Sequence, residues 1–280
     1  MAHSSATRTQ AAIAQGARAT GTDFNYLLAR AKLESGLDPD AKASTSSATG
    51  LFQFIDSTWL ATLDRHGAAH SMEWASGAIH QRGGRHFVTD PALRQQIFGL
   101  RHNPAVASVM AGALAQDNRT ALLPVLGREP DAAELYLAHF LGAGGATSFL
   151  TALQANPFAS AAALLPEAAA ANRGIFYADG AARTLGGVMD LIREKVSRAM
   201  GDASILPGTG DFPLPSATRS RVQPRPDGPA PSAQGTTPSA PSMAALLEKT
   251  FGLGDGASDG GGATPAHVRA AYGKLKAFGL

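Results

Sequence analysis

The prolines of this chain are concentrated in one stretch, and that stretch divides the sequence. Nine of the 17 prolines lie between residues 203 and 242, mixed with Ser, Thr and Gly. Such a segment cannot bury enough apolar surface to offset the entropy lost on ordering, so we expect an extended linker there. Before it, from about Ala11 to Met200, Ala and Leu recur with helical spacing and β-branched runs are few. This pattern predicts an all-α domain.

The same shifts in composition predict where the segments begin and end. We expect an N-terminal arm over 1–20, the helical domain over 21–200, a Pro/Gly/Ser-rich linker over 201–242 and a tail of short helices over 243–280. The second tail helix has the clearer start, because Thr264 can cap it and Pro265 suits the first helical position.

The bulk composition excludes several classes of protein. The chain has no cysteine, which removes disulfides, thiolate catalysis and cysteine-ligated metals. Its 24 basic and 22 acidic side chains leave a net charge of +2, too small to indicate a nucleic-acid partner. No apolar run is long enough to span a bilayer. The first eight residues have no apolar segment behind their charges, so we expect no secretory signal of the standard kind.

One acid lies where a helix should be apolar. A helix is predicted from Phe24 to about Ser35, because Asp23 can cap its start and Gly36 can end it. Glu34 follows Ala31 by three residues and so falls on the apolar face, in the last turn, where the carbonyl end of the helix disfavours negative charge. Both effects favour a protonated carboxyl, which is a candidate general acid. The helix alone leaves open an ordinary helix-end acid whose head reaches water.

Metal and cofactor chemistry have weaker support. His66 and His70 are four residues apart and Glu73 follows, but Gly67 interrupts the helical pattern and no third ligand is clearly placed. No Ser motif of the nucleophile-elbow type is present. We therefore expect no metal and no cofactor.

Short motifs follow Glu34 in a definite order. Glu34-Ser35 precedes Pro39 and Ala41, then a Ser-rich turn, then Gly50-Leu51-Phe52-Gln53. This series resembles the goose-type lysozyme and lytic transglycosylase family, which cleaves peptidoglycan. There, Glu-Ser is followed by Pro and Ala, a Ser/Gly-rich turn, and Gly-Leu-Met-Gln. Here Phe52 stands where Met is usual, and one extra residue sits in the turn.

The resemblance covers roughly Gly21 to Met200 and implies a lysozyme-like helical catalytic domain. It implies that Glu34 is the catalytic residue and that the substrate is bound by Ser35, Ser47, Gly50, Phe52 and Gln53. Gln53 offers a hydrogen-bond donor and an acceptor, and Phe52 offers a flat apolar face for a sugar ring. Taken alone, residues 50–54 also fit an ordinary turn that enters a core helix.

A third motif of the family is usually Ala-Tyr-Asn-Ala-Gly, and its Tyr helps to orient the acid. The best counterpart here is the run from Leu137 to Gly145, in which His139 occupies the Tyr position and Phe140 the Asn position. His139 could donate to the sugar or to Glu34, or be a core histidine. Tyr136, earlier on the same helix, is the rival candidate.

Only Glu34 has a motif context among the acids of its region. Glycosidases usually use two carboxylates, but we expect these others to be solvated: Asp38, Asp40, Asp56, Asp64, Glu73 and Asp90. One acid fits a lytic transglycosylase, in which Glu34 acts first as acid and then as base on the bond between N-acetylmuramic acid and N-acetylglucosamine. The alternatives are a hydrolytic muramidase and a non-catalytic wall-binding or assembly protein.

The implied partner is the peptidoglycan glycan strand, in the periplasm or cell wall. The absence of a recognisable signal leaves three alternatives: export by a dedicated secretion machine, release with a phage-like particle, or a start assigned at the wrong residue. The tail over 243–280 could attach the enzyme to a secretion, flagellar or phage-like assembly through the apolar face around Val268 and Leu275.

Overall fold

The computed structural model describes residues 2–44 and 46–203, and these residues are 69% helical with a few short strands. The prediction of a mostly helical domain is therefore confirmed. The tail over 243–280 and most of the linker over 201–242 lie outside the described residues. The last described helix, α11 (Leu185–Ala203), continues three residues past the predicted end of the helical domain.

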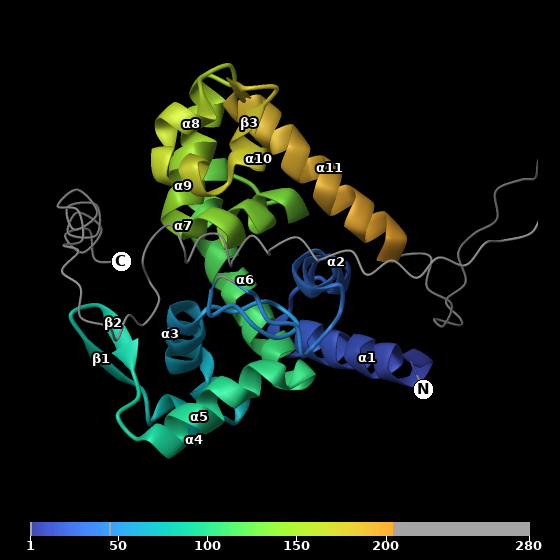
Figure 1. Ribbon diagram of the computed structural model, residues 1–280, viewed down its shortest axis with the longest axis vertical. Coiled ribbons are helices and arrows are strands. Elements are labelled where there is room, and N and C mark those ends of the chain that lie inside the picture. The colour runs from blue at the N-terminus through green and yellow to red at the C-terminus, as the bar shows by residue number, and fades with distance from the viewer. Residues whose placement is uncertain (1, 45, 204–280) are drawn as a thin grey trace, which may run out of the picture.

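A long central helix joins the two parts of the molecule (Figure 1). This helix, α6 (Pro104–Leu126), begins where Asn103 caps its first turn and Pro104 occupies the first helical position. It packs against α1, α3 and α7. In Figure 1 the N-terminal elements surround its lower half: α1 (Ala2–Thr20), α3 (Asp56–His66), η1 (Ala68–His70), α4 (Glu73–Ser76), β1 (His80–Arg82), β2 (Arg85–Phe87), α5 (Pro91–Gly99) and η2 (Leu100–His102).

The C-terminal elements form the upper part of Figure 1. They are α7 (Ala132–Ala155), α8 (Ala161–Leu164), α9 (Pro166–Ala171), α10 (Arg173–Phe176), β3 (Tyr177–Ala178), β4 (Ala181–Ala182) and α11. α7 starts with a capping box formed by Asp131 and Glu134. It is interrupted at Gly142, whose φ of 72° is a left-handed conformation. The two antiparallel hairpins, β1–β2 and β3–β4, were not predicted from the sequence.

The helix that carries Glu34 forms as its local signals predict. α2 (Phe24–Ser35) begins where the Asp23 side chain accepts a hydrogen bond from the Tyr26 amide at 2.8 Å. It ends at Gly36, which has a left-handed φ of 63° and donates its amide to the Lys32 carbonyl. α2 packs against both α11 and α1, so it lies between the two parts of the molecule.

The N-terminal segment belongs to the core, so the predicted arm over 1–20 is corrected. α1 packs along α6, and its Ile13 is fully buried. The two helices come close because both have small residues at the contact: a methyl group added at Gly16 would lie 2.6 Å from Ser108 Cβ. The predicted helical pattern began only at about Ala11, because residues 2–10 show few of the large apolar residues that mark a buried face.

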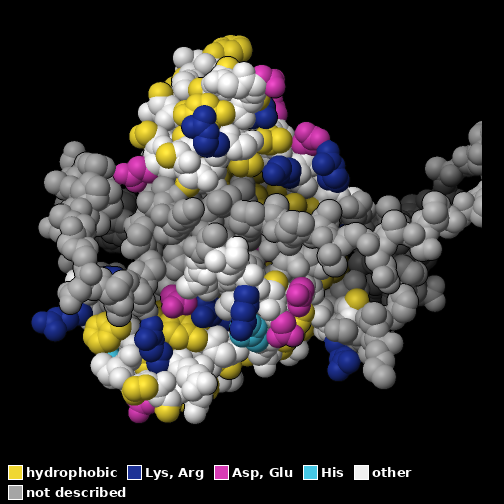
Figure 2. All heavy atoms as spheres, in the orientation of Figure 1, with side chains coloured by type: hydrophobic (Ala, Val, Ile, Leu, Met, Phe, Trp, Pro, Cys, Tyr) yellow, Lys and Arg dark blue, Asp and Glu magenta, His cyan; other side chains and the backbone are white. Residues whose placement is uncertain are grey.

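No helix among the described residues is long and apolar enough to cross a membrane. On the face shown in Figure 2, Lys and Arg side chains lie interspersed with acidic and uncharged ones rather than gathered in one patch. This distribution agrees with the small net charge of the sequence.

Candidate functional site

Glu34 is buried, as its place on the apolar face of α2 predicts. The residue is 6% exposed and its side chain is fully buried. The apolar stripe beneath it includes Leu27 and Ala31, which are also inaccessible. The alternative of a helix-end acid that reaches water is therefore wrong. A buried carboxyl must be paired, hydrogen-bonded or protonated, because burial disfavours the charged form.

Two side chains from α7 hold one oxygen of this carboxyl. The Tyr136 hydroxyl donates to Glu34 Oε1 at 3.0 Å, and His139 Nε2 lies 3.2 Å from the same oxygen. The two rings meet edge to face, with centroids 5.9 Å apart. The sequence left Tyr136 and His139 as rivals, but the structure brings both to Glu34. They are three residues apart on one helix and therefore share a face.

Both donors are neutral at ordinary pH. Burial lowers the pKa of His139, and the nearby Arg30 lowers it further, although contact with Glu34 acts in the opposite direction. Burial raises the pKa of Tyr136 well above its usual value, and the neighbouring Glu34 adds to this effect. The Tyr136 hydroxyl therefore keeps its proton, and His139 is an uncharged imidazole. In that form it can donate to Glu34 as its Nε2–H tautomer.

The other oxygen of the carboxyl is unpartnered. Glu34 Oε2 is buried and makes no hydrogen bond within the part of the chain that the structure describes. Unpaired buried polar atoms are rare in native structures and often mark a place for chemistry or for a ligand. Because Oε1 already has two hydrogen-bonding neighbours, Oε2 is the oxygen of this carboxyl that is left for a ligand or a proton transfer.

The Ser-rich turn lies beside the acid, but several of its predicted substrate contacts are used within the protein. The Ser35 hydroxyl donates to the Leu51 carbonyl at 2.8 Å, which joins the end of α2 to the turn. Gln53 is only 3% exposed, and its amide nitrogen donates to the Ala41 and Gly50 carbonyls at 3.1 and 2.9 Å. These bonds fix the turn, so that amide group is not free for an N-acetyl group.

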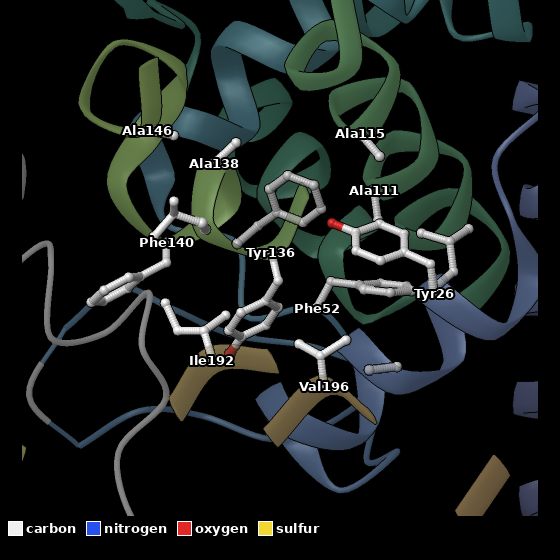
Figure 3. Close-up of a cluster of buried hydrophobic side chains, with 14 of the residues drawn as sticks. Tyr26, Phe52, Ala111, Ala115, Tyr136, Ala138, Phe140, Ala146, Ile192 and Val196 are labelled. Atoms are coloured by element: carbon white, nitrogen blue, oxygen red, sulfur yellow. The ribbon is translucent and has the colours of Figure 1, made fainter. Parts of the chain in front are cut away.

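Gly50 and Phe52 also have structural roles that differ from those predicted. Gly50 has a φ of 80°, and a Cβ there would lie 2.2 Å from the Arg101 carbonyl oxygen, so close approach occurs to protein backbone rather than to a sugar. Phe52 is fully buried, with the Arg30 guanidinium 5.4 Å from its ring centroid. Its expected role as an open surface for a sugar is therefore corrected. Figure 3 shows Phe52 with Tyr26 and Tyr136 in one buried cluster.

Arg101 holds the turn in place and was missed as a key residue. Its Nη1 donates to the carbonyls of Ser47 and Phe54, each at 3.0 Å, and to Asp56 Oδ1 at 2.7 Å. The Ser47 hydroxyl accepts the Asp56 amide at 3.0 Å. The Ser47 side chain thus takes part in fixing the start of α3. Arg101 lies 45 residues from its carboxylate partner, so no local sequence signal marks the contact.

The other acids of the region have separate partners or lie at the surface. Asp56 pairs with Arg101, Asp64 with His86 at 3.3 Å, and Asp90 caps α5. The remaining three are exposed: Asp38, Asp40 and Glu73. None of the six makes a hydrogen bond or ion pair with the groups that hold Glu34 in the described residues.

His66, His70 and Glu73 were weighed above as possible metal ligands, and the structure gives His66 another partner. His66 pairs with Asp117 at 2.9 Å and does not form a metal site with His70. Among the described residues no group of three acidic or histidine side chains is arranged to hold a metal ion. Two surface hollows, of about 460 and 400 Å³, lie elsewhere and are not lined by Glu34.

No model of a known protein family matches this chain. The functional argument therefore depends on the motif residues and on the geometry around Glu34.

Proposed function

We propose that this protein is a peptidoglycan lytic transglycosylase with a lysozyme-like catalytic domain. The observation that carries the proposal is the asymmetry of the Glu34 carboxyl. Oε1 is held by two neutral donors, whereas Oε2 is buried and unpartnered. Such a group is oriented, shielded from water and able to donate one proton from a defined atom.

The proposed reaction uses this carboxyl twice. Glu34 gives its proton to the oxygen that bridges N-acetylmuramic acid and N-acetylglucosamine, and the bond from that oxygen to the muramyl C1 breaks. The substrate's acetamido group stabilises the developing cation. The muramyl C6 hydroxyl then bonds to C1 and returns its proton to Glu34. A 1,6-anhydro ring forms, no water is consumed, and the acid is regenerated.

A single acid is enough for this lyase, and for that reason we propose it ahead of a hydrolase. A hydrolytic glycosidase of the usual kind needs a second carboxylate about 5 to 9 Å from the acid. Each of the six other acids considered has a different partner or faces solvent.

Because the Glu34 side chain is fully buried, the groups that cover it must move aside when a glycan oxygen approaches.

Substitution of the acid tests the proposal directly. Glu34→Gln keeps the size of the side chain but has no proton to transfer, so activity on purified cell walls should fall by about 10² to 10⁴-fold. Glu73→Gln is a matched control, because Glu73 is exposed on α4 and should leave the rate unchanged. Substantial activity in Glu34→Gln would reject the assignment of the acid.

The products distinguish the remaining alternatives. Mass spectrometry of digested walls should show anhydromuramic ends. Reducing muramic ends would indicate a hydrolase, and the absence of any cleavage by the wild-type protein would indicate a wall-binding or assembly protein. Action at the cell wall, and attachment to an export or assembly machine through residues 243–280, are parts of the same proposal.

A further inference from the structure

A stripe of three buried polar residues runs along α2. Tyr26, Arg30 and Glu34 are spaced by four, so they project from one face of the helix, and each is at most 6% exposed. The described residues contain six buried side-chain atoms without a hydrogen-bond partner, and four of them belong to this stripe. These four atoms are the Tyr26 hydroxyl, Nε and Nη2 of Arg30, and Oε2 of Glu34.

Arg30 is the unusual member of the stripe. Its Nη1 donates to the Ala111 carbonyl of α6 at 3.3 Å, and its guanidinium also lies close enough to the Tyr26 hydroxyl to act against the rise in the pKa of that group. The group lies over the rings of Phe52 and Phe54, 5.4 and 5.6 Å from their centroids. No carboxylate among the described residues forms an ion pair with it. Burial of a cation without a counter-charge is destabilising, so the packing of α2 alone does not account for an arginine here.

We infer that Arg30 is a positioning residue that supplies the counter-charge for Glu34 after Glu34 has given up its proton. In its catalytic part this inference rests on the proposed function. Glu34 is one helical turn from Arg30 on the same face, and both side chains end in unpartnered atoms. In a buried setting two charges interact strongly even without direct contact. The ionised acid then exists long enough to act as the base.

The other groups around Glu34 leave this role to Arg30. Tyr26 on α2 and Tyr136 and His139 on α7 are the titratable groups that face the carboxyl. Burial keeps all three neutral near pH 7, since it raises the pKa of each tyrosine and lowers that of the histidine. The groups of α6 and of the turn that contact Arg30 are uncharged. They are the Ala111 backbone carbonyl and the rings of Phe52 and Phe54. Within the part of the chain that the structure describes, Arg30 is therefore the charged neighbour to which we assign the response to ionisation of Glu34.

The first test is the pH profile of wall degradation by the full chain. In Arg30→Met the ionised form of Glu34 loses its counter-charge, so the alkaline limb of kcat/KM should move up by about one pH unit or more. The value of kcat should fall while KM stays unchanged, because the base step is slowed. Arg30→Lys keeps a cation, so the alkaline side of its pH profile should match that of the wild type. If Arg30→Met keeps the wild-type limb while Glu34→Gln is inactive, the inference fails and the proposed function stands. If Glu34→Gln is active, the proposed function itself fails.

The second test does not depend on activity. Thermal unfolding is followed by circular dichroism from pH 5 to pH 9 for the wild type, Arg30→Met, Glu34→Gln and the double variant. The stability lost in Arg30→Met should grow as the pH rises, because an ionised Glu34 is then unpaired. In the Glu34→Gln background, the stability lost on replacing Arg30 should no longer depend on pH. Should Arg30→Met fail to fold, the double variant is expected to fold. An equal, pH-independent loss in both backgrounds, or a failure of both to fold, shows that Arg30 serves packing alone and overturns the inference.

Discussion

Two sets of polar side chains, a turn network and the α2 stripe, differ in how fully their groups are paired. In the turn network, the side chains of Ser35, Gln53 and Arg101 all donate to backbone carbonyls. On the α2 stripe, four polar atoms have no partner. A fully paired network fixes one backbone geometry, whereas unpaired buried groups are costly unless they serve a reaction or a ligand. The turn network therefore fixes the backbone, and the unpaired groups of the stripe are the ones to which we assign the proposed reaction.

The turn network should show the largest effect on folding. Arg101→Met removes the partner of Asp56 and the donor to two carbonyls, so the free energy of unfolding should fall by about 3 kcal/mol, as for other broken buried pairs. Urea denaturation followed by circular dichroism measures this loss. Activity per folded molecule should stay close to wild type. Arg65→Met is the control, because the Arg65 pair with Asp117 is largely exposed and should contribute little.

Substitution of a donor to Glu34 should lower activity much more than it lowers stability. Tyr136→Phe keeps the ring but removes the hydroxyl that holds Oε1, so the rate on cell walls should fall by about 10 to 100-fold, in line with a hydrogen bond to a charged group. Thermal stability should change little. Tyr177→Phe, on β3, gives the matched control. A wild-type rate in Tyr136→Phe would mean that the hydroxyl does not orient the acid, and the contrast between the two networks would weaken.

The smallest effect is a pH dependence of stability from His139. Its pKa is lowered in the folded protein, mainly by burial, from an ordinary value of 6.5. Below about pH 6.5 the unfolded chain therefore binds a proton that the native protein does not, and stability falls as the pH falls. His139→Gln removes this term, so its melting temperature should decline less than that of the wild type between pH 7 and pH 5. Parallel declines would show that His139 is not buried in its neutral form.

The sequence predicted the parts of the site that depend on local signals. Asp23 and Gly36 set the ends of α2, and the spacing of Glu34 from Ala31 set its buried face. The motif around His139 and Tyr136 indicated which helix would meet the acid. Helix caps and helical periodicity act within a few residues, so they can be recognised without the fold.

The parts that were missed depend on contacts between distant segments. Phe52 and Gln53 were expected to face a sugar, yet they face Arg30 and the Ala41 carbonyl. Which side of a turn is covered depends on what packs against it, and here Arg30 lies over Phe52 and Arg101 holds the backbone at Phe54. Long-range packing of this kind leaves no periodic trace in a sequence.

The tight contact between α1 and α6 has a practical consequence for fragments of this protein. At Gly16 and Gly112 the two helices approach so closely that an added methyl group would meet Ser108 or Thr20 at 2.6 Å or less. A shortened polypeptide that starts at Gly21 therefore uncovers a part of α6 next to Ala111, whose carbonyl accepts a hydrogen bond from Arg30. Trimming at the boundary suggested by composition would thus disturb the packing around Arg30 and Glu34, although the hydrogen bonds to Glu34 in the described residues come from α7.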